Sequence, residues 1–153
     1  MRTRRGSRFL VGNVRGKGLE AIGEASLALG AFRKAVYRQV DLLRWVAHLE
    51  KAVFGESGGE ANLQDAAGSS LDTDDGESFI SAVVLDIPGT EPVIHLADCG
   101  HPPPLLLRDG TVLPLEARQP APPLGLTGFG PDGVEVESFP FREGTSCCCT
   151  RTG

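Results

Sequence analysis

The sequence predicts an α+β domain in which two helices pack on a sheet or sandwich of antiparallel strands. Two long stretches in the first third of the chain carry apolar residues three and four positions apart, the spacing of one face of an amphipathic helix. The second half instead contains short apolar runs separated by turns with glycine or proline, which is typical of antiparallel strands. With 153 residues, the chain has the length of a single domain.

The first predicted strand, residues 8–14, leads into a glycine turn, and a helix is predicted over residues 19–38. The stripe expected to be buried on this helix is Ile22, Ala25, Leu29, Phe32 and Val36. Asp41 is the expected N-cap of a second helix, because its carboxylate can accept hydrogen bonds from free backbone N–H groups. Glycines at 55, 58 and 59 should end that helix. Its buried stripe is expected to be Leu42, Trp45, Val46, Leu49 and Val53.

Two segments are expected to lack a packed structure. Residues 1–7 carry a cluster of arginines and are predicted to form a frayed, solvated end. Residues 55–77 are rich in Gly, Ser, Asp and Glu and are predicted to form a flexible linker. Within the linker, Asp72–Glu77 is similar to the start of a calcium loop, but Gly76 stands where the third acidic ligand belongs. The linker interpretation is therefore favoured.

The second half of the chain is predicted to be a series of strands. Residues 78–87 and 92–100 form two of them, separated by a proline-glycine turn. Residues 105–115 have the pattern of a β-hairpin, with Asp109-Gly110 as the two-residue turn between apolar arms. Residues 134–141 alternate between apolar and polar side chains, as a half-buried strand does.

Composition and cysteine spacing exclude several classes of protein. The formal net charge is −5 and no basic stripe with interleaved aromatic residues occurs, so nucleic-acid binding is not expected. The apolar runs are far shorter than the roughly 20 residues of a membrane span, and no signal peptide is recognisable. A cytoplasmic protein is therefore expected, with a membrane or sensor segment upstream left open. Cys99 is expected to be a small buried side chain, and Cys147–Cys149 lack the spacing of zinc ligands.

The stretch VGNVRGKG, residues 11–18, is the first with a chemical signature. A P-loop has four residues between its first glycine and G-K-[ST], whereas three separate Gly12 from Gly16, and Gly18 replaces the hydroxyl residue. The spacing also differs from the G-x-G-x-x-G fingerprint of dinucleotide-binding proteins. The pattern alone favours a strand-to-helix corner over a nucleotide site.

Several motifs resemble one family in its own order. VGNVRGKGLEAIGEASLALGAFR resembles the G-D-V-x-G-K-G motif and helix of metal-dependent protein serine/threonine phosphatases of the PP2C type, in their bacterial SpoIIE-like branch. The resemblance continues through FISAVVLDI, through IHLADCGHPPPLLLRDG, which is similar to N-x-G-H-P-P-P-L-L, and through PAPPLGLTG. It covers about residues 8–144 and identifies the chain as a member of this family.

The resemblance implies a partial α-β-β-α sandwich of antiparallel sheets with flanking helices, in which residues 1–153 form one incomplete phosphatase domain. It also implies two Mn²⁺ or Mg²⁺ ions that activate water to attack phosphoserine or phosphothreonine. The implied substrate is a regulatory phosphoprotein such as an anti-sigma-factor antagonist. Asn13 matches the motif's metal-binding aspartate, and Val14 matches the residue whose backbone carbonyl reaches a metal. The scaffold positions of the motifs are Gly12, Gly16, Lys17, Gly18, Gly100 and His101.

The chain also departs from the family pattern where acidic residues are expected. Asn13 supplies an amide oxygen but no negative charge. The family's first acidic motif, G-G-D-x-x-D, should precede Phe9, and its T-D-G motif and last aspartate should follow Gly144; the sequence contains none of them. No catalytic residue can be assigned. Two functions stay open: a metal-dependent protein phosphatase, and a catalytically inactive relative or fragment that binds a partner.

The last ten residues, GTSCCCTRTG, have the pattern expected from a change of reading frame. Family members usually continue with D-Q-L-L-L-Y-T-D-G, which G+C-rich codons write as GAC CAG CTG CTG CTG TAC ACG GAC GGG. With GG placed in front, the shifted frame encodes Gly-Thr-Ser-Cys-Cys-Cys-Thr-Arg-Thr-Gly, identical to residues 144–153. We hypothesise a frameshift, in the gene or in its sequencing, at or just before Gly144. It would replace a leucine strand by the three cysteines.

Overall fold

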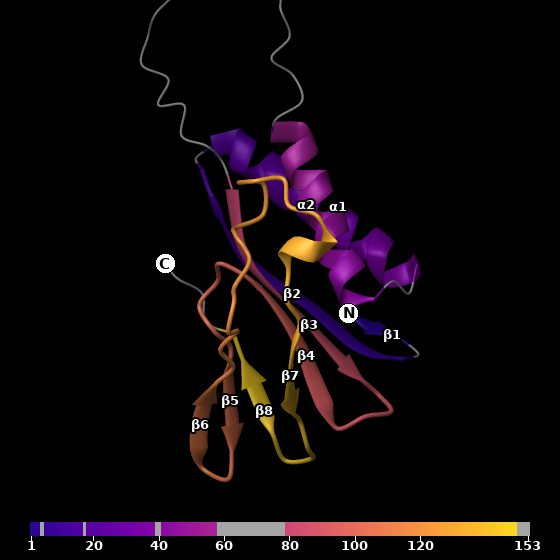
Figure 1. The fold of residues 1–153 in the computed structure, drawn as a ribbon, viewed down its shortest axis with the longest axis vertical. Helices are drawn as coiled ribbons and strands as arrows, with labels where there is room; N and C mark the ends of the chain where they lie inside the picture. The colour runs from indigo at the N-terminus through magenta and orange to yellow at the C-terminus, as the bar shows by residue number, and fades with distance from the viewer. Residues whose placement is uncertain (4, 17, 39–40, 58–78, 150–153) are drawn as a thin grey trace, which may run out of the picture.

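The computed structural model describes residues 1–3, 5–16, 18–38, 41–57 and 79–149 (Figure 1). Its elements, in chain order, are β1 (Arg2–Thr3), β2 (Gly6–Arg15), α1 (Gly18–Arg38), α2 (Leu42–Ser57), β3 (Phe79–Pro88), β4 (Val93–Cys99), β5 (Leu105–Arg108), β6 (Thr111–Pro114), η1 (Pro131–Gly133), β7 (Glu137–Pro140) and β8 (Ser146–Cys148). The predicted helices and strands are thus present, with shifted ends.

These elements form a helical layer and two antiparallel sheets. The larger sheet has the strand order β1-β2-β3-β4-β7, and the smaller sheet has the order β6-β5-β8. One core cluster joins α1 and α2 to one face of the larger sheet, and Figure 1 shows the two helices side by side over it. A second cluster, with residues of β3, β4 and β5, lies between the two sheets. The predicted α+β class and the partial sandwich are confirmed.

Helix α2 follows its sequence pattern closely. The Asp41 carboxylate accepts a hydrogen bond from the backbone N–H of Arg44 at 2.9 Å, so the predicted N-cap is confirmed. All five residues of the predicted stripe are buried, and the Trp45 ring lies 5.1 Å from the Phe32 ring of α1, centroid to centroid. The stripe therefore fixes both the helix–sheet and the helix–helix contact.

Helix α1 differs from its pattern in its first half. Phe32 and Val36 are buried as predicted, but Ile22 is 63% exposed and Leu29 is 51% exposed, so the prediction is wrong for these two residues. The helix instead buries three alanines, whose small side chains allow close packing: Ala28, Ala31 and Ala35. It lies over β2, beyond which the sheet continues only with the two residues of β1, so its outer side has no described strand beneath it.

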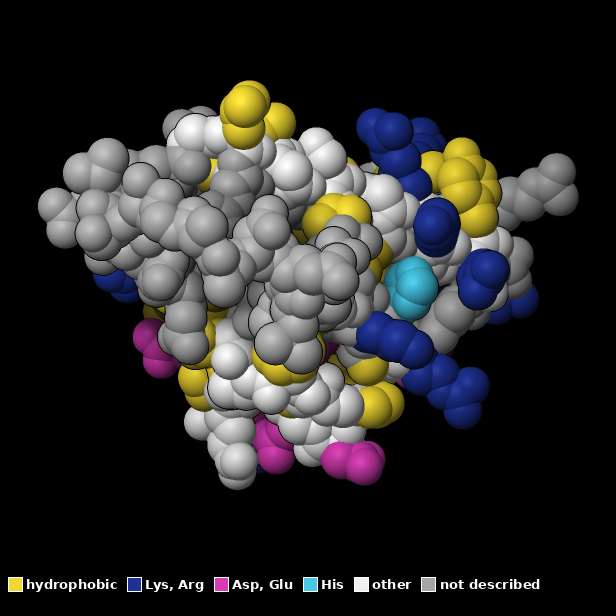
Figure 2. All heavy atoms as spheres, turned by 90° about the horizontal axis from the view of Figure 1, so that it is seen from above, with side chains coloured by type: hydrophobic (Ala, Val, Ile, Leu, Met, Phe, Trp, Pro, Cys, Tyr) yellow, Lys and Arg dark blue, Asp and Glu magenta, His cyan; other side chains and the backbone are white. Residues whose placement is uncertain are grey.

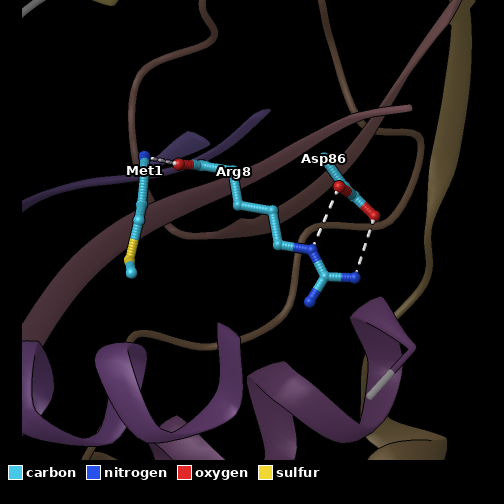
Figure 3. Close-up of polar contacts among 3 residues, drawn as sticks. All are labelled: Met1, Arg8 and Asp86. Carbon is cyan, nitrogen blue, oxygen red and sulfur yellow. Dashed lines mark hydrogen bonds and ion pairs between the residues drawn. The ribbon is translucent and has the colours of Figure 1, made fainter. Parts of the chain in front are cut away.

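The N-terminus is paired rather than frayed, which corrects the prediction for residues 1–7. Arg2 pairs with Ser7 in an antiparallel hairpin, and the N–H of Arg8 donates to the carbonyl of Met1 at 2.8 Å. The Met1 ammonium donates in turn to the Arg8 carbonyl (Figure 3). Backbone pairing holds this end because a strand edge offers free N–H and C=O groups.

Arg8 also joins the larger sheet to α2. Its Nε donates to Asp86 Oδ1 at 3.1 Å and its Nη2 donates to Asp86 Oδ2 at 3.4 Å, across adjacent strands (Figure 3). The guanidinium carbon lies 5.0 Å from the centre of the Trp45 ring, within the range of a cation–π contact. One arginine thus contacts β3 and α2 at once.

The hairpin and the C-terminal strand complete the smaller sheet. Asp109 and Gly110 both have positive φ, 51° and 74°, as expected for the favoured two-residue hairpin turn, so this prediction is confirmed. Strand β8 pairs with β5, and its Cys147 packs against the core between the sheets. The frameshift hypothesis stays a prediction. From position 58 on, the predicted linker lies outside the described residues, and so does Asp72–Glu77 within it. Before that position, α2 continues to Ser57.

Candidate functional site

The glycine motif forms the predicted corner between β2 and α1. Strand β2 ends at Arg15 and α1 begins at Gly18, whose φ of 71° lies in the left-handed region that favours glycine. Gly16 lies between them, and Lys17 lies outside the described residues. The local sequence therefore specifies a tight turn, and the strand before it positions Asn13.

Asn13 lies in the last part of β2, opposite Ser81 of β3. The Ser81 hydroxyl lies 3.5 Å from the backbone carbonyl oxygen of Asn13, to which it donates a long hydrogen bond. The Asn13 side chain is exposed, and the neighbouring Val14 side chain packs against the core under the helices. Asn13 thus presents a neutral amide at the surface.

The second motif forms a tight turn at the end of β4. Asp98 Oδ1 accepts the backbone N–H of His101 at 2.8 Å, which closes the turn. Gly100 has a φ of 70°, and a Cβ atom there would lie 3.0 Å from Cγ of Pro123. The His101 side chain is buried. Glycine is therefore required at position 100 both by its backbone conformation and by the approach of the proline.

The structure brings these motifs together around Ala82 of β3. Gly12 pairs with Ala82 from β2, and Gly100 forms a bridge to Ala82 from the other side. Two residues earlier, Ile80 exchanges backbone hydrogen bonds of 2.9 Å with Leu124 in both directions. Segments far apart in the sequence therefore meet at one end of the larger sheet, which is what a site built from these motifs requires.

Glu50 of α2 anchors the third of these segments and was not predicted. Its side chain is only 1% exposed, and its two oxygens accept the backbone N–H groups of Gly125 and Gly128, each at 2.8 Å. Burial raises the pKa of this carboxyl above its ordinary value, against the opposing effect of these hydrogen bonds. A sequence signal existed, because Glu50 lies four residues after Val46 and three before Val53, on the buried face of the helix.

The carboxylates of Glu50 and Asp98, near this end of the sheet, accept hydrogen bonds from backbone N–H groups. Burial is the largest influence on Asp98 and raises its pKa, while the hydrogen bond from His101 lowers it. Among the described residues, no group of three or more His, Cys, Asp or Glu side chains could hold a metal ion. Two hard divalent cations require several carboxylate oxygens, and Asn13 supplies a neutral one. The described residues therefore do not fit the two-metal centre that the resemblance implies.

Cys99 is a structural side chain, as predicted. It is fully buried, and burial raises the pKa of its thiol far above its ordinary value. A protonated thiol is a poor nucleophile and metal ligand.

No described helix is long and apolar enough to cross a membrane.

Comparisons with known proteins find a matching family model and several solved structures with a similar fold. The model of the Stage II sporulation protein E (SpoIIE) family matches residues 3–150. No curated protein gives a significant match. Solved structures with a similar fold include the RsbU and RsbW domains of a Mycobacterium tuberculosis protein, with 22% identity, a TM-score of 0.68 and coverage of 94% of this chain and 35% of that one.

Two further structures are phosphatases. The PP2C domain of Bacillus subtilis SpoIIE, solved with a fragment of its regulatory domain, has 16% identity and a TM-score of 0.61, over 92% of this chain and 36% of that one. The serine/threonine phosphatase PstP/Ppp of Mycobacterium tuberculosis has 15% identity and a TM-score of 0.58, over 94% of this chain and 73% of that one. The catalytic domain of PstP has also been solved in complex with two manganese ions.

At these identities the structures establish the fold, and the chain spans about a third of the RsbU–RsbW and SpoIIE chains. The family model, by contrast, extends over nearly every residue of the chain, including the corner at β2 and the turn after β4. The protein belongs to the SpoIIE family of PP2C-type phosphatase domains.

Proposed function

We propose that this chain provides the framework of a phosphatase domain that acts on phosphoserine or phosphothreonine in a regulatory protein. The observation that carries the proposal is the convergence of Gly12, Gly100 and Leu124 on β3, in a member of the SpoIIE family. Bacillus subtilis SpoIIE is described as a cell fate determinant, and this supports a regulatory phosphoprotein as substrate, such as an anti-sigma-factor antagonist.

The cofactor expected for this reaction is Mn²⁺ or Mg²⁺, as the manganese complex of PstP supports. The donor set described above is insufficient for it, since Asn13 is neutral and the Asp98 carboxylate accepts a backbone N–H. Hydrolysis therefore depends on carboxylates beyond the described residues.

A second candidate function is binding of a phosphoprotein or partner without hydrolysis. The neutral side chain at Asn13 favours it, because a metal-bridging position without charge binds divalent cations weakly. The shape of the domain can be retained without that charge, since glycine turns and apolar packing, rather than the ligands, hold the strands around Ala82.

The test is Asn13→Asp in a repaired full-length protein that contains the upstream acidic motif and the restored reading frame after Gly144. We expect Mn²⁺-dependent release of phosphate from a phosphoserine peptide to rise by about tenfold or more, the scale on which changes at a metal centre act. Asn13→Ala is the matched control and should not raise the rate. Chelation by EDTA should abolish the gain.

Two outcomes separate the candidates. Equal rates for the Asn13 protein and both variants would show that this position does not bind metal, and the assignment of the site would be wrong. Undetectable hydrolysis by all three, with unchanged binding of the phosphopeptide, would establish the binding function instead.

A further inference from the structure

A groove of about 600 Å³ lies between α1 and α2, apart from the end of the sheet where the motifs meet. Its lining comes from successive turns of α1 and from two residues of α2: Gly23, Ser26, Leu27, Gly30, Ala31, Lys34, His48 and Ala52. Most of these side chains are small, so the backbone of α1 forms much of the groove wall. We call this the α1/α2 groove.

Several described positive side chains lie on the helices that form the α1/α2 groove, although the whole chain has a formal net charge of −5. The charged side chains that the structure describes as exposed on the two helices are positive: Arg33, Lys34, Arg38, Arg44 and Lys51. Arg44 is already paired with Asp41 at 3.5 Å, which leaves Arg33, Lys34, Arg38 and Lys51 for an acidic partner. Glu24 and Glu50 are buried. Figure 2 shows Lys and Arg side chains gathered around a histidine over the helical side of the molecule. A surface of this charge is complementary to an acidic partner.

Two glycines in the groove are not required by packing among the described residues. Gly23 and Gly30 lie two turns apart on α1, and a Cβ atom at either would meet no atom of these residues within 4 Å. A glycine within a helix costs about 0.5–1 kcal/mol relative to alanine. Both positions therefore give up helix stability without an internal gain, which is expected where another backbone approaches closely from outside.

We propose that the α1/α2 groove binds an acidic amphipathic helix of a partner protein. The small side chains allow the apolar face of that helix to lie close to α1, and its carboxylates face Lys34 and His48. The lining from Gly23 to Lys34 extends roughly 16 Å at 1.5 Å per residue, about three turns of a docked helix. This proposal does not rest on the proposed hydrolysis of phosphoester bonds.

The test uses the full chain and two synthetic helical peptides. One carries alanine and leucine on one face and glutamate on the other, and the second replaces each glutamate by lysine. Fluorescence anisotropy at low salt should show that the glutamate peptide binds about tenfold or more tightly, since electrostatic complementarity sets the choice of partner. Lys34→Glu should weaken binding severalfold, whereas Arg33→Glu, on the neighbouring residue outside the lining, should have a smaller effect.

Glycine substitutions separate the shape of the groove from its charge. Gly30→Ala should raise the melting temperature and weaken peptide binding. Gly55→Ala is the matched control, since Gly55 lies outside the groove lining and a Cβ at this helical glycine of α2 also meets no described atom within 4 Å. It should raise the melting temperature and leave binding unchanged.

Three results would overturn the proposal. Equal affinity for both peptides, or equal losses for the Arg33 and Lys34 variants, would show that no specific acidic site exists. Unchanged peptide binding by a folded Gly30→Ala protein would exclude the groove. Sedimentation as a dimer that Gly30→Leu converts to a monomer, or binding to anionic phospholipid vesicles but not to the peptide, would identify a different occupant.

Discussion

Replacing Glu50 by alanine removes both acceptors that tie the segment after Pro123 to α2. The N–H groups of Gly125 and Gly128, each 2.8 Å from a carboxylate oxygen, would be left without these partners. Hydrogen bonds to a charged group contribute about 1.5–3 kcal/mol each, so the pair corresponds to roughly 3–6 kcal/mol. Relief of the buried charge offsets part of this. We therefore expect the free energy of unfolding to fall by about 2–4 kcal/mol.

Glu50→Gln separates the charge from the shape. Glutamine retains one oxygen acceptor and loses the other, so at neutral pH we expect about half the loss seen for alanine. Because burial raises the pKa of Glu50 above 4.5, the folded state binds this proton more readily than the unfolded state. The stabilisation from this group is complete below pH 4.5 and is lost as the pH rises through the folded-state pKa. The native protein should therefore lose stability relative to Glu50→Gln over that range.

The assay is urea unfolding followed by the fluorescence of Trp45, the single tryptophan of the chain, at several pH values. Hydrogen exchange at the amides of Gly125 and Gly128 gives a local readout. Glu116→Ala, at an exposed glutamate, is the control and should change the free energy of unfolding by less than about 0.5 kcal/mol. The reasoning is refuted if Glu50→Ala costs no more than this control, or if both amides keep their protection.

Three other predictions concern the sheet, its turns and the tail. Gly100→Ala should destabilise the protein by about 1–3 kcal/mol in urea unfolding, because its φ is 70° and the new Cβ would lie 3.0 Å from Pro123, and a loss under 0.5 kcal/mol would contradict this. Arg8→Met should lower the free energy of unfolding by about 2–4 kcal/mol, since it leaves the half-buried Asp86 without its ion-pair partner and removes the contact with the Trp45 ring. An unshifted midpoint of urea unfolding would contradict this prediction. A DNA read across the codons for residues 138–153 should reveal a one- or two-base change that restores L-L-L-Y-T-D-G, and codons incompatible with that frame would refute the frameshift hypothesis.

The parts of the fold that could be predicted are those in which one local pattern decides the outcome. The stripe of α2 has large apolar side chains on one face, so burial leaves a single orientation for the helix. Asp41 and the Asp109-Gly110 turn act through their own backbone conformations and hydrogen bonds, and both behave as their sequence predicts.

The parts that failed depend on neighbours that the local pattern does not specify. Ile22 and Leu29 continue the spacing of Phe32, yet α1 lies over the side of the sheet where only β1 follows β2. Which apolar positions become buried there is decided by tertiary packing and not by periodicity. The N-terminal residues failed for the same reason, because the partner of Arg2 is a strand residue at Ser7 and not a side chain.

In the candidate site too, the local motifs could be recognised from the sequence, but their arrangement in space could not. The resemblance of the motifs to the family could suggest that Gly12 and Gly100 belong to one site, but only the structure places them on opposite sides of Ala82. The spacing of Glu50 from Val46 and Val53 could have indicated that it is buried, but its partners could not be predicted, because they are backbone N–H groups 75 and 78 residues away.

Fold and activity place separable demands on this chain. Positive φ values at Gly18 and Gly100 and the close approach of Pro123 are requirements of the backbone, and any loss of these glycines would strain the domain whether or not it hydrolyses a phosphoester. A negative charge at position 13 would be a requirement of the proposed metal site alone. The side chain at position 13 is exposed and does not belong to the core. Asparagine rather than aspartate at this position therefore has little effect on folding. Under the proposed function, hydrolysis would therefore depend on a charge at position 13 that folding of this chain does not require.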